Sequence, residues 1–108
     1  MRLFDLQVNG YLGVDFSSET LDAASFRDVA HALIEHGVTL FLPTVITSFE
    51  ACYQRNLAIL SDVLDHDEEL RAHIPGFHLE GPFISPEPGA VGAHPAAAVH
   101  LPDCAYFD

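Results

Sequence analysis

The stretch Gly37-Val38-Thr39-Leu40-Phe41-Leu42-Pro43 decides the fold class of this sequence. Between its glycine and its proline lies a largely apolar run, from Val38 to Leu42. Such a run is typical of a strand buried on both faces of a parallel sheet, whereas a strand with one wet face alternates apolar and polar residues. We therefore expect a strand over residues 38–42, ended by Pro43.

A helix is expected immediately before this strand. Ser25 and Asp28 stand at the spacing of a capping box, in which the two side chains bond main-chain N–H groups at the start of a helix. Gly37 occupies the position where helices commonly end in a left-handed residue. Apolar residues recur between these signals at helical spacing, which predicts one buried face. They are Phe26, Val29, Ala30, Leu33 and Ile34.

A second helix is expected after the strand. Thr47-Ser48-Phe49-Glu50 offers another capping signal, and we assign no chemistry to Thr47 or Ser48. The run Asp65 to Glu69 is interpreted as the solvated end of this helix. Its buried stripe is predicted to consist of Tyr53, Leu57, Leu60 and Leu64.

Two further strands complete the pattern. Residues 74–79 are predicted to form one of them, and residues 2–9 form the other by strict alternation. Strand, helix, strand, helix and strand then follow in order, which predicts an α/β fold of right-handed parallel units. From Gly81 onward the sequence becomes rich in proline and glycine, so a long C-terminal loop is expected. In residues 2–9, Phe4, Leu6 and Val8 share the face that packs on helices, whereas Asp5, Gln7 and Asn9 share the other.

Composition excludes several classes of partner. The 108 residues carry 16 acidic side chains, four arginines and no lysine, for a net charge of −12. Nucleic acid and anionic membranes are therefore not expected as partners. No apolar run approaches the roughly 18 residues that a membrane span needs, so we expect a cytoplasmic protein. Cys52 and Cys104 form no metal or disulfide motif and are interpreted as ordinary thiols.

The segment Phe77-His78-Leu79-Glu80-Gly81 carries the clearest chemical signal. Side chains alternate along a strand, so His78 and Glu80 point to the same side. An ionised carboxylate at the end of a buried strand is costly unless it meets a cation or strong donors. Glu80 is therefore a candidate metal ligand. The alternative, a strand-end glutamate that reaches water, stays open.

Five blocks of this sequence resemble one family of enzymes. In the same order as here, they are similar to motifs of the N-acetylglucosamine-6-phosphate deacetylases of the amidohydrolase superfamily. The resemblance extends over residues 5–95. Its blocks are Asp5 to Gly10, Gly13 to Phe16, Gly37 to Ser48, His78 to Phe83 and Gly92 to Pro95.

The resemblance implies a fold, an activity and a missing remainder. The family is built on a (β/α)8 TIM barrel, which needs about 250 residues. Residues 1–108 are therefore expected to be an N-terminal fragment of a barrel domain, inactive by itself. The implied reaction is hydrolysis of the acetamide of N-acetylglucosamine 6-phosphate to glucosamine 6-phosphate and acetate, in amino-sugar catabolism. The full-length enzyme is expected to be a homo-oligomer.

The resemblance also implies roles for particular residues. Glu80 matches a metal ligand that two histidines from later strands complete, holding one divalent ion, with Zn²⁺ favoured and iron or another first-row ion as the alternative. Ala93 and His94 match residues that contact the amino-sugar phosphate. The catalytic aspartate is expected downstream of this chain. Gln7 and Asn9 stand where related enzymes carry a His-x-His pair for a second metal, and they either bond the barrel mouth or orient water or substrate.

Several alternatives remain at this stage. His78 is either a donor that steadies the Glu80 carboxylate or a satisfied core histidine. The chain as a whole is alternatively a small non-catalytic βαβ binding module, or part of a related amidohydrolase such as an N-acetylgalactosamine-6-phosphate deacetylase. The remaining histidines are expected to be structural or exposed; they are His31, His36, His66, His73 and His100.

Overall fold

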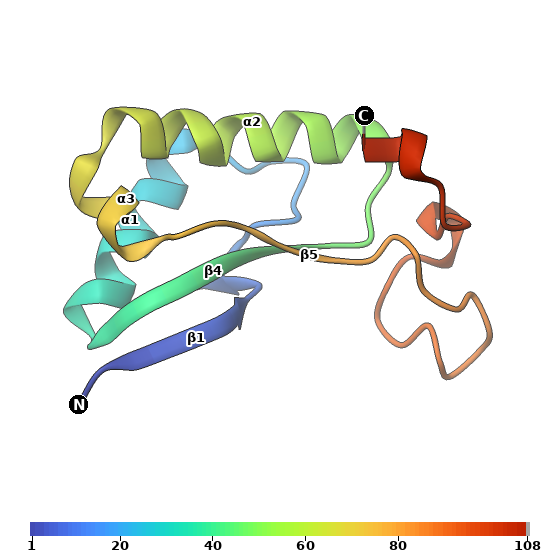
Figure 1. Ribbon diagram of the computed structural model, residues 1–108, viewed down its shortest axis with the longest axis horizontal. Coiled ribbons are helices and arrows are strands. Elements are labelled where there is room, and N and C mark those ends of the chain that lie inside the picture. The colour runs from blue at the N-terminus through green and yellow to red at the C-terminus, as the bar shows by residue number, and fades with distance from the viewer. Residues whose placement is uncertain (108) are drawn as a thin grey trace.

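The computed structural model describes residues 1–107, and Figure 1 shows a small sheet with its helices on one side. Three parallel strands form the sheet in the order β1, β4, β5. A two-stranded antiparallel hairpin, β2 and β3, follows the first strand. The strands are β1 (Leu3–Val8), β2 (Gly10–Tyr11), β3 (Val14–Asp15), β4 (Val38–Ile46) and β5 (His78–Glu80); the α-helices are α1 (Ala23–Glu35), α2 (Glu50–His66) and α3 (Glu68–His73).

The predicted parallel α/β arrangement is confirmed. β4 lies between its two neighbours, with Phe4 opposite Leu40 on the β1 side and Ile46 opposite Glu80 on the β5 side. α1 connects β1 to β4, and α2 with α3 connects β4 to β5. Because all three strands run the same way, their carboxyl ends meet at one edge of the sheet.

The core lies between β4 and the helices. Phe41 and Val45 of β4 are fully buried, as are Phe26 of α1 and Leu60 of α2. Each such side chain contributes roughly 1.5–3 kcal/mol by leaving water. Leu40, Leu42 and Ile46 alternate with them along β4 and are only half-buried. The helices therefore cover one face of β4 much more completely than the other.

The predicted strand boundaries were wrong at two places. β4 continues through Pro43 to Ile46, because Pro43 lies opposite Val8 where the β1–β4 ladder is already irregular, so its missing N–H interrupts little. β5 begins only at His78, since Ile74 is buried directly after α3 and Pro75 cannot donate to a ladder. On β1, Val8 is buried as predicted, but Phe4 and Leu6 are 52% and 61% exposed because the described helices pack on β4 and the hairpin and not closely on β1.

The helix boundaries also needed correction. Asp22, not Ser25, caps α1, and its Oδ1 accepts from the Ser25 N–H at 2.7 Å. α2 has no side-chain cap, since the Ser48 hydroxyl donates instead to the Ile46 carbonyl at 2.9 Å. Gly37 follows α1 with φ +98°, which confirms the predicted left-handed residue.

A third helix replaces the predicted solvated end of α2. Asp67 leaves the helical conformation, and its Oδ1 accepts from the Leu70 N–H at 3.0 Å to start α3. The new helix turns Leu70 into the core, where it is fully buried. Asp67 therefore both ends α2 and caps α3, and Leu70 reaches the core from the new helix.

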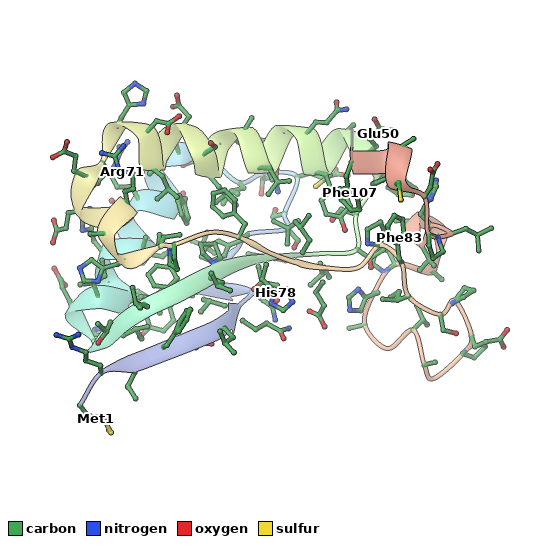
Figure 2. The ribbon with its side chains drawn as sticks, in the orientation of Figure 1. Met1, Glu50, Arg71, His78, Phe83 and Phe107 are labelled. Carbon is green, nitrogen blue, oxygen red and sulfur yellow. The ribbon has the colours of Figure 1, made fainter. Side chains whose placement is uncertain are left out.

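The C-terminal segment is not uniformly a loop. Two short 3₁₀ turns occur in it, η1 (Ala96–Ala98) and η2 (Cys104–Phe107). Figure 2 shows Phe83 close to Phe107, and their ring centroids are 5.4 Å apart in an edge-to-face arrangement. Such pairs stabilise packing by about 0.5–1.5 kcal/mol beyond the area that they bury. Within residues 1–107, no helix has the length and apolar content needed to cross a bilayer.

A buried amide anchors the segment between the hairpin and α1. Asn56 of α2 is fully buried, and its Nδ2 donates to the carbonyls of Phe16 at 3.0 Å and Ser18 at 2.9 Å. Arg55 donates in turn to Asn56 Oδ1 at 2.8 Å and to the Leu21 carbonyl at 2.6 Å. These bonds satisfy main-chain groups that no strand partner reaches.

Replacing Asn56 with alanine is expected to destabilise the protein by about 3 kcal/mol, because two buried carbonyls lose their donor. Urea unfolding followed by circular dichroism measures the change. Gln54→Ala, on the exposed side of the same helix, is the matched control and should change stability by less than about 0.5 kcal/mol. Equal effects at the two positions would contradict the assigned role.

Asp67 predicts a pH dependence of stability. The Leu70 N–H bond, together with His31 and Arg27, lowers the pKa of Asp67 below its usual value of 3.8. The folded state therefore binds this proton more weakly than the unfolded chain does. The stabilisation is complete above the unfolded pKa and is lost as pH falls through the folded one.

Asp67→Asn keeps an oxygen for the cap but removes the charge. At pH 5.5 the variant should be less stable than the wild type by about 0.5 kcal/mol, and the deficit should shrink as the pH approaches 3. Thermal unfolding across this range measures it, with the exposed Asp65→Asn as control. A deficit that stays constant with pH would disprove the linkage.

Candidate functional site

The candidate site lies at the edge where the three parallel strands end. β1 brings Gln7 to this edge, β4 ends in Ile46 with Thr47 directly after it, and β5 ends in Glu80. A loop then returns from Gly81 and carries His94 back to the same edge. Residues separated by up to 87 positions in the chain, from Gln7 to His94, thus line one cavity.

Glu80 is contacted by side chains from two other segments. Gln7 Nε2 donates to Glu80 Oε2 at 2.6 Å. Because β4 lies between β1 and β5, these two side chains reach each other across β4. On the other oxygen, His94 Nε2 lies 3.4 Å from Glu80 Oε1. The carboxylate is oriented from both sides yet keeps 35% of its side-chain surface exposed, which leaves lone pairs open to a ligand.

His94 is fixed from behind by Thr47. The ring Nδ1 lies 2.8 Å from Thr47 Oγ1 and accepts from the Thr47 main-chain N–H at 3.4 Å. Only 15% of the His94 side chain is exposed, although the residue belongs to an otherwise open loop. The histidine is therefore part of a built site and not a surface side chain.

His78 lies beside this group but bonds elsewhere. Its Nδ1 is 3.0 Å from the Leu6 carbonyl, so that nitrogen carries the proton and donates to β1. Figure 2 shows the residue close to the end of β1. His78 was one candidate for the donor that steadies the Glu80 carboxylate, but Gln7 makes that contact. His78 instead connects β5 to β1 across β4.

An open cavity of about 830 Å³ joins the candidate residues. Of the six predicted site residues, five line it and His78 does not; the five are Gln7, Asn9, Glu80, Ala93 and His94. The hairpin adds Tyr11, Val14 and Asp15, which sequence reasoning missed. The sequence signals for them were the glycines that open this turn, Gly10 and Gly13, and the block Gly13 to Phe16 of the family resemblance.

The donor set at this edge is incomplete for a divalent metal ion. Zn²⁺ is usually bound by three or four protein ligands of the His, Cys, Asp and Glu types. Among residues 1–107, no three such side chains gather closely enough to hold an ion. Glu80 fits as one ligand, with an oriented and partly exposed carboxylate, but the described residues do not complete a metal site.

Comparison with curated proteins now identifies the relatives of this chain. A mouse protein is 45% identical over 94 residues, a Caenorhabditis elegans protein 42% over 99 residues, and a Bacillus subtilis protein 34% over 110 residues. Each is named N-acetylglucosamine-6-phosphate deacetylase. The predicted family resemblance is confirmed. A comparison with models of protein families finds no match.

The relatives are much longer than this chain. The matches cover 86%, 88% and 97% of it, but only 22%, 23% and 26% of the mouse, nematode and Bacillus proteins. The chain thus spans about a quarter of the length of these deacetylases.

Solved structures agree with the fold. The N-acetylglucosamine-6-phosphate deacetylase of Thermotoga maritima matches with a TM-score of 0.77 at 26% identity, over 97% of this chain and 26% of that one. The corresponding enzyme of Pasteurella multocida gives a TM-score of 0.80 at 24% identity, over 98% and 26%. The three-stranded parallel sheet with its helices therefore matches part of the deacetylase fold.

Gly81 is predicted to be irreplaceable at the turn after Glu80. Its φ is +99°, and a Cβ there would lie 2.0 Å from Thr47 Oγ1. Gly89 has a similar φ of +88°, but a Cβ there would meet no atom within 4 Å. A substitution at Gly89 therefore measures the cost of the backbone conformation without a steric clash.

Gly89→Ala is expected to cost about 1 kcal/mol, and Gly81→Ala about 1–3 kcal/mol more. Urea unfolding of the two variants measures the difference. Equal costs would show that the contact between Gly81 and Thr47 is looser than described.

Proposed function

We propose that the protein containing this chain hydrolyses the acetamide of N-acetylglucosamine 6-phosphate, giving glucosamine 6-phosphate and acetate. We further propose that residues 1–108 form an N-terminal part of its (β/α)8 barrel. The observation that carries the proposal is the position of Glu80, at the carboxyl end of a parallel strand and inside the cavity. Active sites of such barrels lie at this end of the strands. The names of the relatives supply the substrate.

In this proposal Glu80 is one ligand of a single divalent ion, with Zn²⁺ favoured. Such an ion, when bound, polarises the acetamide carbonyl and lowers the pKa of an attacking water. The remaining ligands and the carboxylate that moves the proton belong to segments outside residues 1–108. The isolated 108-residue chain is accordingly proposed to be inactive.

The residues of this chain position the reactants. Gln7 holds Glu80 Oε2 through a 2.6 Å hydrogen bond, which leaves the carboxylate one preferred orientation. Ala93 and His94 are proposed to contact the amino-sugar phosphate from the loop, and Asn9 lines the same cavity. As a neutral amide, Asn9 is suited to hydrogen-bond a sugar hydroxyl or a water.

The phosphate is proposed to be bound by groups from elsewhere. Among the described residues, no arginine lines the cavity, and the sequence has no lysine. Arg55 is engaged with Asn56 and Leu21, while Arg27 and Arg71 lie near Asp67 and Glu68. A dianionic phosphate is bound most strongly by cationic side chains, and the described residues place no arginine or lysine at this cavity.

Glu80→Gln in the full-length protein tests the proposal, because an amide is a much poorer metal ligand than a carboxylate. We expect the bound metal to be lost and acetate release to fall by at least about 100-fold. Elemental analysis and a coupled acetate assay measure the two effects. Glu87→Gln, in the same loop but outside the cavity, is the matched control.

Two results would count against the proposal. Retention of metal and rate by the Glu80→Gln protein would remove Glu80 from the site. Turnover by the isolated 108-residue chain with added Zn²⁺, at the rate of the full-length protein, would refute the claim that essential groups lie outside it.

A further inference from the structure

Thr47 occupies the point where three segments of the site meet. It follows β4 directly, and only 1% of it is exposed. Its Oγ1 lies 2.8 Å from His94 Nδ1 in the returning loop and 3.5 Å from the main-chain carbonyl of Glu80 at the end of β5. The resemblance gave this residue no role, and it does not line the cavity.

The contacts around Thr47 determine which nitrogen of the His94 ring carries the proton. The Thr47 main-chain N–H can only donate, and it points at His94 Nδ1 over 3.4 Å. Nδ1 must therefore accept, so it carries no proton. The Thr47 hydroxyl then donates to the same nitrogen, because that contact is 0.7 Å shorter than the one to the Glu80 carbonyl (2.8 against 3.5 Å).

The other ring nitrogen follows from this assignment. With Nδ1 unprotonated, the neutral imidazole carries its proton on Nε2. That atom lies 3.4 Å from Glu80 Oε1, so the protonated nitrogen faces the carboxylate in an electrostatic contact. In the opposite tautomer, the Nε2 lone pair would face the negatively charged Glu80 Oε1. The Nδ1–H of His94 would also point at the main-chain N–H of Thr47.

We propose that Thr47 is a positioning residue, which locks His94 as the Nε2-protonated tautomer facing Glu80. The hydroxyl and the main-chain N–H act together on one ring nitrogen and so fix both the proton and the ring orientation. Only the part of this inference that concerns turnover rests on the proposed function. The tautomer itself depends on the geometry alone.

The turn after Glu80 is shaped around this hydroxyl. A Cβ on Gly81 would lie 2.0 Å from Thr47 Oγ1, so the absence of a side chain there leaves the room that the hydroxyl fills. Thr44, three residues earlier in β4, offers a direct contrast. It is equally buried, but its hydroxyl donates to the Leu42 carbonyl at 3.0 Å, and no bond to His94 is formed.

The tautomer is measured by nuclear magnetic resonance of full-length, metal-free protein with labelled histidine, at about pH 8.5, where an ordinary imidazole is neutral. The nitrogen shifts of His94 should show protonated Nε2 and bare Nδ1. A protonated Nδ1 in the wild-type protein would overturn the proposal. This measurement does not depend on whether any variant folds.

The variants then test the cause. Thr47→Val should raise the share of the Nδ1-protonated tautomer by about fivefold to tenfold, as expected for the loss of one hydrogen bond. Thr47→Ser restores the hydroxyl and should return the wild-type shifts. Thr44→Val removes a buried hydroxyl that does not reach His94 and should leave them unchanged. An unchanged Thr47→Val spectrum, or an equal change in Thr44→Val, would overturn the assignment.

Kinetics of the Zn²⁺-loaded protein test the consequence for turnover. Thr47→Val should lower kcat/KM for N-acetylglucosamine 6-phosphate by about tenfold, with Thr47→Ser close to the wild type. If the tautomer shifts as expected but wild-type protein releases no acetate, the proposed function fails and the positioning role stands. If wild-type protein is active and Thr47→Val changes neither spectrum nor rate, the positioning role fails alone.

Discussion

The parallel pairing of β4 with both of its neighbours is the constraint on which the rest of the structure depends. Burial of Phe41 and Val45 against the helices holds β4 in place. Its two ladders then bring the ends of β1 and β5 to the same edge. Gln7 and Glu80, 73 positions apart in the chain, can form a 2.6 Å hydrogen bond only because of this arrangement.

The polar groups at that edge form a chain of neutral donors ending on one charge. Thr47 donates to His94, Gln7 donates to Glu80 Oε2, and His94 Nε2 lies 3.4 Å from Glu80 Oε1. Neutral donors orient a carboxylate without cancelling its charge, which keeps the group attractive to a cation. Fold and chemistry are coupled here, since each donor comes from a different strand or loop.

Sequence reasoning succeeded where a signal is local. The helical stripe of α1, the left-handed Gly37 and the apolar run of β4 each follow from nearest-neighbour geometry, and all three are present. It failed where distant contacts decide. Pro43 does not end β4. The β1–β4 ladder is irregular opposite Pro43, so the N–H that proline lacks interrupts little of the hydrogen bonding. Asp67 caps a new helix whose Leu70 is fully buried, whereas the acidic run Asp65 to Glu69 had been interpreted as the solvated end of the preceding helix.

For the site, the sequence alone determined which side chains are suited to bind a ligand or a metal ion. They are a carboxylate at a strand end, a histidine in the following loop and two amides on the first strand. Alternation along a strand and the family resemblance were sufficient for that. Only the tertiary structure decided how these residues are connected. In the structure, Gln7 forms the hydrogen bond that orients Glu80, and His78 bonds to the Leu6 carbonyl instead. Thr47 contacts His94 Nδ1. Hydrogen bonds between segments far apart in the chain depend on how strands are ordered and where a loop returns, and neither is encoded in the spacing of nearby residues.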